Sequence, residues 1–396
     1  PLPLFYGFFV LDPFSFFFKI AALGIVALTL LASLAYRPAN GDSKETLPYF
    51  GEYTTLFLFL GFGLILMGSS NNLLMIFLSI EFVSIVSYLL TGFLKRNLKS
   101  KEAALKYLLF GSVASGVMLF GMSLLFGLTG EIDLNLIHVK LVSTSIPPAW
   151  VMSVLSLIMV GIGFKISMAP FHMWAPDVYE GAPTPVTGFL TVGPKALGFA
   201  IFLRVLQTSF LELQHDWSFL LAALSMLPMT IGNVIAVSQT NIKRLLGYSS
   251  IAQAGYILMG LAVSNTIGLT GVLIYLLAYI FTNLGAFLCV IAASNHLQSD
   301  EIDSYAGLSE KSPLLAGCLV LFMLSLAGIP PLGGFIGKYY VFASAIQGRF
   351  FTLAVVAALN SAVAAFYYFK VVRQMYLTPA ANPGPISFSL PLLLVM

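Results

Sequence analysis

The 396-residue chain is poor in charge, since Asp, Glu, Lys and Arg together make up only 9% of it. Soluble globular domains carry about 25% charged residues, so this composition excludes a soluble domain. Hydrophobic residues make up 59% of the chain. They gather in runs of roughly 20 residues, the length that crosses a bilayer as a helix. A β-barrel would instead alternate apolar and polar residues over segments of about ten. We therefore expect an all-α polytopic membrane protein.

Cysteine is scarce as well, and familiar cofactor motifs are missing. Cys289 and Cys318 stand alone in apolar runs and form no CxxC or metal-ligand pattern, which favours small buried core residues. No Gly-rich phosphate loop follows a strand, and no haem attachment site or nucleophile–His–Asp arrangement is recognisable. The run 247–250 is no nucleophile elbow, because no strand precedes it. The sequence predicts no metal site and no redox cofactor on this chain.

Neither end of the chain resembles a natural terminus. It begins with Pro1 rather than methionine and stops inside an apolar run at 390–396. Residues 1–10 lack the basic start and cleavage site of a signal peptide. We expect a piece of a longer protein.

Twelve hydrophobic segments follow one another along the chain. They lie at 12–36, 53–69, 72–94, 103–127, 150–168, 184–207, 217–238, 244–263, 267–294, 313–346, 351–376 and 385–396. Prolines break the helix at two of them. Pro170 and Pro176 come directly after the fifth segment, and Pro330 and Pro331 lie within the tenth. Broken backbone at membrane depth persists only where protein buries it or where it lines a watery cavity. The two breaks therefore indicate functional sites.

Basic loop residues predict the orientation. They cluster after the third, seventh and eleventh segments: Lys95, Arg96, Lys99 and Lys101; Lys243 and Arg244; Lys370 and Arg373. All three clusters fall on one side of the membrane if the segment count is right. The positive-inside rule makes that side the cytoplasm. We expect a multi-pass protein of a bacterial inner (plasma) membrane or an organellar equivalent.

The breaks recur at the same place in two sets of five segments. The first set, over 53–207, is broken beside Lys165, and the second, over 208–376, is broken beside Lys338. Because five is odd, the second set enters the membrane from the opposite face. This is the inverted-repeat plan of secondary transporters, with sites on discontinuous helices near the midplane. An N-terminal helix and loop at 1–52 and a truncated helix at 377–396 complete the predicted organisation.

Four charged residues lie deep within predicted spans: Glu81, Lys165, Lys195 and Lys338. A lysine at membrane depth costs at least about 2.5–3.5 kcal/mol, so by default it marks a functional site. An acid close to such a lysine stabilises its charged form, and lysine and glutamate in one dry bundle make an adjustable proton store. The alternatives are a purely structural carboxylate and lysine side chains that reach the interface.

Other polar residues near the first break are open to two interpretations. Lys106 opens the fourth segment, where it either joins the buried charges or reaches the membrane surface. Asp177 and Glu180 follow the break, and we expect them to cap or orient it rather than carry protons. His172 lies near the centre and is either a proton relay or a ring that is simply hydrogen-bonded.

Three runs carry a family resemblance, at 163–186, 238–256 and 324–340. They closely resemble the antiporter-like membrane subunits of proton-pumping NADH:quinone oxidoreductase, respiratory complex I, and within that family look most like subunit N. The likeness spans essentially the whole chain. It implies fourteen helices with two inverted five-helix repeats, so about two helices would precede Pro1 and part of the last would follow Met396.

The resemblance also implies residue roles and partners. It places the proton channel on Glu81, Lys106, Lys165, Lys195 and Lys338, with electrostatic shifts passing between them. The protein would act as a translocase subunit without a redox centre of its own. NADH, FMN, iron–sulfur clusters and quinone are then expected on partner subunits. The expected partners are other membrane-arm subunits, including neighbouring antiporter-like ones, and the lipid bilayer, with no nucleic acid.

Two further functions stay open at this point. A subunit of a multi-subunit Na⁺/H⁺ antiporter would share these helices, and a structural scaffold would not need the buried lysines. Co-purification with NADH-oxidising subunits separates the first alternative from the complex I assignment. Tolerance of Met or Leu at the lysines would indicate a scaffold. Within the family, the lysine at position 338 favours subunit N or L. In subunit M the corresponding position resembles a glutamate instead.

Overall fold

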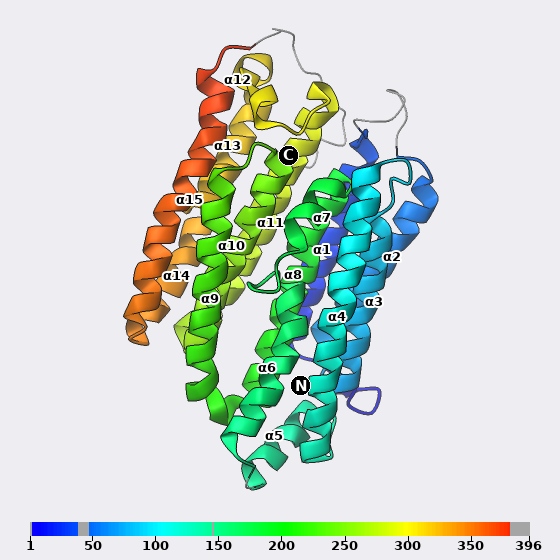
Figure 1. The fold of residues 1–396 in the computed structure, drawn as a ribbon, viewed down its shortest axis with the longest axis vertical. Helices are drawn as coiled ribbons and strands as arrows, with labels where there is room; N and C mark the ends of the chain where they lie inside the picture. The colour runs from blue at the N-terminus through cyan, green and yellow to red at the C-terminus, as the bar shows by residue number, and fades with distance from the viewer. Residues whose placement is uncertain (1, 39–46, 145, 381–396) are drawn as a thin grey trace.

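A computed structural model of the chain describes residues 2–38, 47–144 and 146–380. Its helices are α1 (Pro13–Ala35), α2 (Phe50–Ser69), α3 (Leu73–Thr91), α4 (Leu98–Thr129), α5 (Leu134–Ser143), α6 (Pro148–Lys165), α7 (Ala175–Gly181), α8 (Thr184–Thr208), α9 (Gln214–Val237), α10 (Ile242–Val263), α11 (Thr266–Leu297), α12 (Leu308–Lys311), α13 (Pro313–Ala327), α14 (Gly333–Gln347) and α15 (Phe351–Leu377). Two short 3₁₀ turns cover Leu211–Leu213 and Ile302–Tyr305. Most helices run along one common direction, so the molecule is an elongated bundle (Figure 1).

The predicted membrane segments are confirmed over the described residues. Ten helices there are long and apolar enough to span a bilayer: α1–α4, α6, α8–α11 and α15. They correspond to the first nine predicted segments and the eleventh. The tenth segment is the pair α13 and α14, each too short to span alone. The twelfth, at 385–396, lies outside the described residues.

Both predicted helix breaks are present. α6 ends at Lys165 and the chain resumes as α7 only at Ala175. α13 ends at Ala327, where Gly328 adopts a left-handed conformation with φ of 88° that glycine accepts without strain. Proline cannot extend a helix across either interruption, because it lacks the N–H that the preceding turn needs. Each break leaves helix ends, with their unpaired backbone groups, inside the protein.

Two small elements escaped the sequence prediction. An antiparallel hairpin of β1 (Leu2–Leu4) and β2 (Phe9–Leu11) precedes α1. The short helix α5 follows α4 at the end of the bundle opposite α12 (Figure 1). Strands of three residues and one ten-residue helix carry too little periodicity to stand out from loops.

Similar junctions occur at opposite ends of the bundle. Asn72, the N-cap of α3, forms an isolated antiparallel bridge with Asp133, which follows α4. Asn241, the N-cap of α10, forms the same kind of bridge with Glu301, which follows α11. α4 and α11 are both 32 residues long. The first junction lies at the α5 end and the second at the α12 end (Figure 1).

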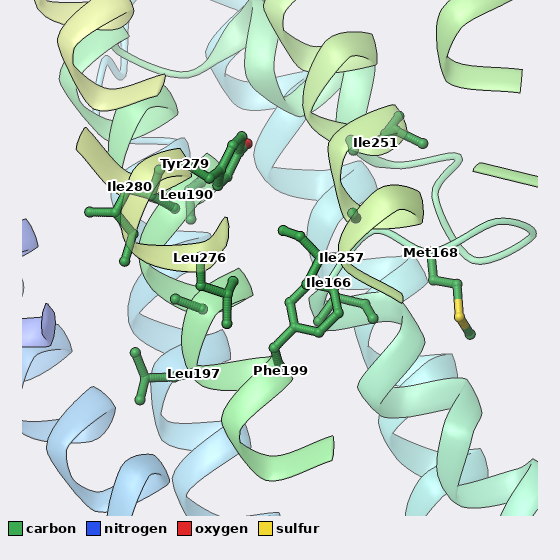
Figure 2. Close-up of a cluster of buried hydrophobic side chains, with 14 of the residues drawn as sticks. Ile166, Met168, Leu190, Leu197, Phe199, Ile251, Ile257, Leu276, Tyr279 and Ile280 are labelled. Carbon is green, nitrogen blue, oxygen red and sulfur yellow. The ribbon is translucent and has the colours of Figure 1, made fainter. Parts of the chain in front are cut away.

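Three helices form the interior of the bundle. In α8, α10 and α11, 94%, 100% and 83% of the apolar span is buried by other parts of the protein. Apolar side chains from the first break and from these three helices meet in one cluster, which includes Ile166, Leu197, Ile257 and Leu276 (Figure 2). Charged side chains on α8 and α10 are therefore kept away from lipid.

Candidate functional site: buried lysines along the bundle

Lys165 is a buried charge without a hydrogen-bond partner. It is the last residue of α6, its exposed fraction is 2%, and its Nζ makes no hydrogen bond. The carboxylate of Glu81 on α3 acts on it electrostatically. Glu81 itself accepts a hydrogen bond from the Ser115 hydroxyl on α4. The Glu81 carboxylate is thus hydrogen-bonded by the neutral Ser115 hydroxyl. It still acts electrostatically on Lys165, which has no hydrogen bond.

Lys195 links the two halves of the chain. It follows Pro194 inside α8, and its Nζ donates to the Ser250 carbonyl of α10 at 2.9 Å and to the Ser250 hydroxyl. The ammonium also lies 5.9 Å from the ring centroid of Tyr179 on α7. Neutral oxygens and an aromatic face therefore surround the ammonium, and each of these contacts favours its charged form against the cost of burial.

Lys338 is hydrogen-bonded to the backbone at the second helix break. It lies in the second turn of α14 and donates to the carbonyl of Ala327, the last residue of α13, at 2.9 Å. That carbonyl is free because the helix stops there. The Tyr256 ring covers the ammonium at 4.6 Å from its centroid. A side chain on Gly328 would displace the lysine, because its Cβ would lie 2.7 Å from Lys338 Cδ.

Uncharged polar residues of α10 lie between the surroundings of Lys195 and those of Lys338. Gln253 on α10 donates to the Leu326 carbonyl at 2.9 Å and to the Tyr368 hydroxyl at 3.3 Å. Sequence reasoning singled out the run 238–256 but missed its function. The available signal was spacing: Ser250, Gln253 and Tyr256 are three residues apart, so they share one side of a fully buried helix.

His172 lies in the first break, between α6 and α7. Its exposed fraction is 7%, and Nδ1 is buried without a hydrogen-bond partner. Lys195 acts on it electrostatically. The histidine is therefore close enough to Lys195 to respond to its charge.

Lys106 differs from the other predicted site residues. Its side chain is 38% exposed and pairs with Asp177 at 2.6 Å and with Glu102 at 2.7 Å. Arg244 completes the cluster by pairing with Asp177 at 2.8 Å and Glu180 at 3.0 Å. Burial alone would raise the pKa of Asp177, but hydrogen bonds from Lys106 and Arg244 hold it below its ordinary value of 3.8. The two acids tie α7 to α4 and α10, as expected for residues that orient the break.

The same contacts bring the basic clusters together. Lys99 pairs with Glu180 at 2.8 Å, and Glu180 also holds Arg244. Lys370 donates to the Gln239 carbonyl, just before α10, at 3.0 Å. The prediction that the three clusters share one end of the bundle is confirmed.

The described part of the chain offers no obvious metal site. No group of three or more His, Cys, Asp or Glu side chains within it could hold a metal ion. Cys289 is buried and Cys318 half-buried, and both are free thiols.

Comparisons with known proteins show the family to which the chain is related. A protein family described as "NADH:quinone oxidoreductase/Mrp antiporter, TM" matches residues 70–364. NADH-quinone oxidoreductase subunit N 2 of Chloroherpeton thalassium is 42% identical over 99% of this chain and 78% of its own length. NAD(P)H-quinone oxidoreductase subunit 2 of the Mesostigma viride chloroplast is 45% identical over 94% of this chain and 73% of its own.

A solved structure shares the fold. A chain of respiratory complex I from Thermus thermophilus, determined with bound aureothin, superposes with a TM-score of 0.81 and 33% sequence identity. The match covers 99% of this chain and 83% of that one. A chain of the same overall fold is thus found in a respiratory membrane complex.

Proposed function

The chain belongs to the family of membrane subunits shared by NADH:quinone oxidoreductases and Mrp antiporters, and from that premise we propose that it moves protons along Glu81, Lys165, Lys195 and Lys338. It is an antiporter-like membrane-arm subunit of an NADH:quinone oxidoreductase, a translocase, and it lies among other membrane-arm subunits. Its relatives are named subunit N or subunit 2, in agreement with the sequence motifs. Bacterial and chloroplast relatives fit an inner or organellar membrane.

The proposed path crosses two inverted five-helix repeats, 53–207 and 208–376. Three observations support this organisation: the matching junctions at Asn72 and Asn241, the equal lengths of α4 and α11, and a broken helix in the fourth place of each set. Because the junctions lie at opposite ends of the bundle, the second repeat is upside down relative to the first. Each repeat then places a lysine, Lys165 or Lys338, at its own break.

Proton movement would start from the unpaired Lys165. Rotation of Glu81 away from Ser115 and toward Lys165 would stabilise the ammonium, and its return would release the proton into the interior. The next acceptors are Lys195, held by Ser250, and Lys338, held by Ala327. His172 lies within the field of Lys195 and could relay between the first pair.

Lys106 has a separate part in this proposal. Its pairing with Asp177 places it at the basic end, where it fixes α7 and so the position of the break beside Lys165. Redox chemistry would take place on partner subunits, where NADH, FMN, iron–sulfur clusters and quinone are expected. Their reactions would reach this chain as a change in the charge or position of a neighbouring group.

The observation that carries the proposal is a buried, unpaired ammonium within the field of a carboxylate. Replacement of Lys165 with Met in the assembled complex keeps the volume and removes the charge. We expect the initial rate of NADH-driven proton uptake, measured in inverted membrane vesicles, to fall by at least about tenfold, as for loss of a proton-transfer group. Lys101→Met, at an exposed position of α4, is the matched control. Undiminished proton uptake in a complex that assembles normally would reject the proposal.

The family description also covers Mrp antiporters, so a Na⁺/H⁺ antiporter subunit is the second candidate. The two functions separate in the native membrane. An antiporter subunit would purify without NADH-oxidising partners and would exchange Na⁺ for H⁺ in vesicles. Mass spectrometry of the intact native assembly decides between them.

A further inference from the structure

Uncharged groups surround the ammonium of Lys338. Its Nζ donates to the Ala327 carbonyl at 2.9 Å and lies 4.6 Å from the centroid of the Tyr256 ring. The lysine is buried, and among the described residues no carboxylate forms a salt bridge with it or acts on it electrostatically. A buried ammonium without a carboxylate depends on such neutral contacts for its charged form.

The first break differs, because an acid acts on its lysine. Glu81 lies nine residues after Asn72, the N-cap of α3, and supplies that negative charge. The residue nine positions after Asn241, the N-cap of α10, is Ser250. The second half of the chain thus has a hydroxyl where the first has a carboxylate. The face of the Tyr256 ring is then the main electron-rich surface over the lysine of the second break.

The ionisable side chains around Lys338 are tyrosines. α14 packs against α10, α11, α13 and α15. Cys318 of α13 lies towards the other end of that helix, and the cations of α10 and α15 lie towards the basic end of the bundle. The tyrosines are Tyr256 of α10, Tyr275 of α11, Tyr368 of α15, and Tyr339 and Tyr340 of α14 itself. Tyrosine is neutral below about pH 10, so in this described region a change of charge near neutral pH falls on Lys338.

A buried amide holds the far end of the Tyr256 ring. Asn233 on α9 donates to the Tyr256 hydroxyl at 3.3 Å, and Ser361 on α15 donates to it at 3.3 Å. The Asn233 carbonyl oxygen accepts from the Tyr367 hydroxyl at 3.0 Å. Because a tyrosine ring tilts about its Cβ, fixing the hydroxyl fixes the direction of the face that meets the lysine.

A second amide completes this network. Asn360 on α15 accepts from Asn233 at 3.4 Å, and it donates to the Thr230 hydroxyl at 3.2 Å and to the Val356 carbonyl at 3.0 Å. Both amides are buried, and each uses its carbonyl oxygen and its NH₂ group. A buried polar network whose members are all paired specifies one arrangement. Two outer helices, α9 and α15, thus fix a side chain of the interior helix α10.

We propose that the Tyr256 ring stabilises the protonated form of Lys338, and that Asn233 is the positioning residue that holds the ring over the ammonium. The inference rests on the proposed function, because it assigns two residues to one step of the same lysine chain. It gives α9 and α15 an influence on a charge that neither helix touches.

The first test weakens the ring face while keeping its shape. Tyr256→Phe is the starting variant, and phenylalanines with one, two and three ring fluorines then withdraw electron density from the face step by step. A weaker face disfavours the ammonium, so the lysine loses its proton at lower pH. In the assembled complex, we expect the alkaline limb of the pH profile of NADH-driven proton uptake to move to lower pH with each fluorine, by about one pH unit across the series.

Tyr53 provides the matched control for this series. It is fully buried on α2, and its hydroxyl lies 3.0 Å from that of Ser33 on α1. The same replacements at Tyr53 should leave the pH profile in place. If the network around Tyr256 only packs helices, the fluorine series there also leaves the profile in place, and the proposal is overturned.

The second test removes the anchor. Asn233→Leu keeps the volume and leaves the Tyr256 hydroxyl without this donor. We expect the alkaline limb to move to lower pH by about half a pH unit. The double variant with Tyr256→Phe should shift little further than either single variant, because both changes break one contact. Asn295→Leu is the control, since this amide joins α11 to the Ala35 carbonyl of α1.

The outcomes separate these roles from the function on which they rest. If Lys338→Met abolishes proton uptake while the fluorine series leaves the pH profile in place, the role of Tyr256 is wrong and proton translocation stands. If Lys338→Met pumps normally, the proposed function fails at this lysine. If the fluorines shift the profile but Asn233→Leu does not, the assignment of Asn233 is overturned.

Discussion

The three buried lysines have different partners, and this difference decides what each can do. Lys165 has no hydrogen bond, Lys195 has two oxygens of one serine, and Lys338 has a helix-end carbonyl and an aromatic ring. A charge held by neutral oxygens depends on their positions, because no carboxylate compensates for small shifts. The charge on each lysine would therefore respond to the movement of a different neighbouring group.

Gly328 allows a direct test of how closely Lys338 is held. An alanine there would take a left-handed conformation, at about 1–2 kcal/mol, and its Cβ would push against the lysine side chain. We expect Gly328→Ala to lower both the thermal stability of the assembled complex and its proton uptake per NADH. Gly317→Ala, on the same helix α13 with open space around it, should change neither. Normal pumping by Gly328→Ala would show that Lys338 tolerates displacement.

At the scale of elements, α1 is fixed to α8 by a half-buried ion pair. Asp12, the N-cap of α1, accepts hydrogen bonds from Arg204 at 2.9 and 3.1 Å. Burial alone would raise the pKa of Asp12, but the hydrogen bonds from Arg204 and Ser15 hold it below its ordinary value of 3.8. The charged carboxylate thus favours the folded state.

That shift predicts a pH dependence. Above the ordinary carboxyl pKa of 3.8 the ion pair contributes fully, and its contribution is lost as the pH falls through the lower folded-state value. Asp12→Asn should therefore lower the stability of the detergent-solubilised protein at neutral pH by about 0.5–1.5 kcal/mol, because solvent screens the half-buried pair. The difference from the unsubstituted protein should shrink in acid. The half-exposed Asp216, replaced by Asn, is the control, and thermal unfolding across the pH range is the measurement. A gap that stays constant with pH would contradict this account.

The elements themselves were largely predictable from the sequence, because their causes are local. Spans follow from runs of apolar residues, and breaks follow from Pro170, Pro330 and their neighbours. The partners of Arg204 were not predictable. Asp12 lies 192 residues away from it, and only the packed bundle brings them together. The same holds for Asn283, which donates to the Thr191 hydroxyl 92 residues away.

At the scale of the whole molecule, the charged ends define an orientation that can be measured. Lys101 lies at the basic end and Glu212 near the opposite one, and both are exposed. In sealed inverted vesicles, Lys101→Cys should react with an impermeant maleimide from the cytoplasmic face, and Glu212→Cys only after the membrane is opened. Cys289 and Cys318 are replaced with Ala as the background control. The reverse pattern of labelling would overturn the orientation.

The candidate site was predictable in part. Three lysines stood out because charged residues are rare within membrane spans, and the structure buries all three: Lys165, Lys195 and Lys338. Lys106 could not be placed from sequence, because a lysine near a helix start can point either way. The polar side chains of α10 were overlooked because serine, glutamine and tyrosine carry no charge, and their role depends on what they touch.

Lys243 has a mechanical consequence for the whole bundle. From the first turn of α10 it donates to the carbonyls of Glu180 and Ala182, at the C-terminal end of α7 in the other half of the chain. A transporter that rotates one half of the bundle against the other would have to break both hydrogen bonds of Lys243 on every cycle. For the proposed function, this contact therefore favours movements of side chains and water over rotation of one half of the bundle against the other.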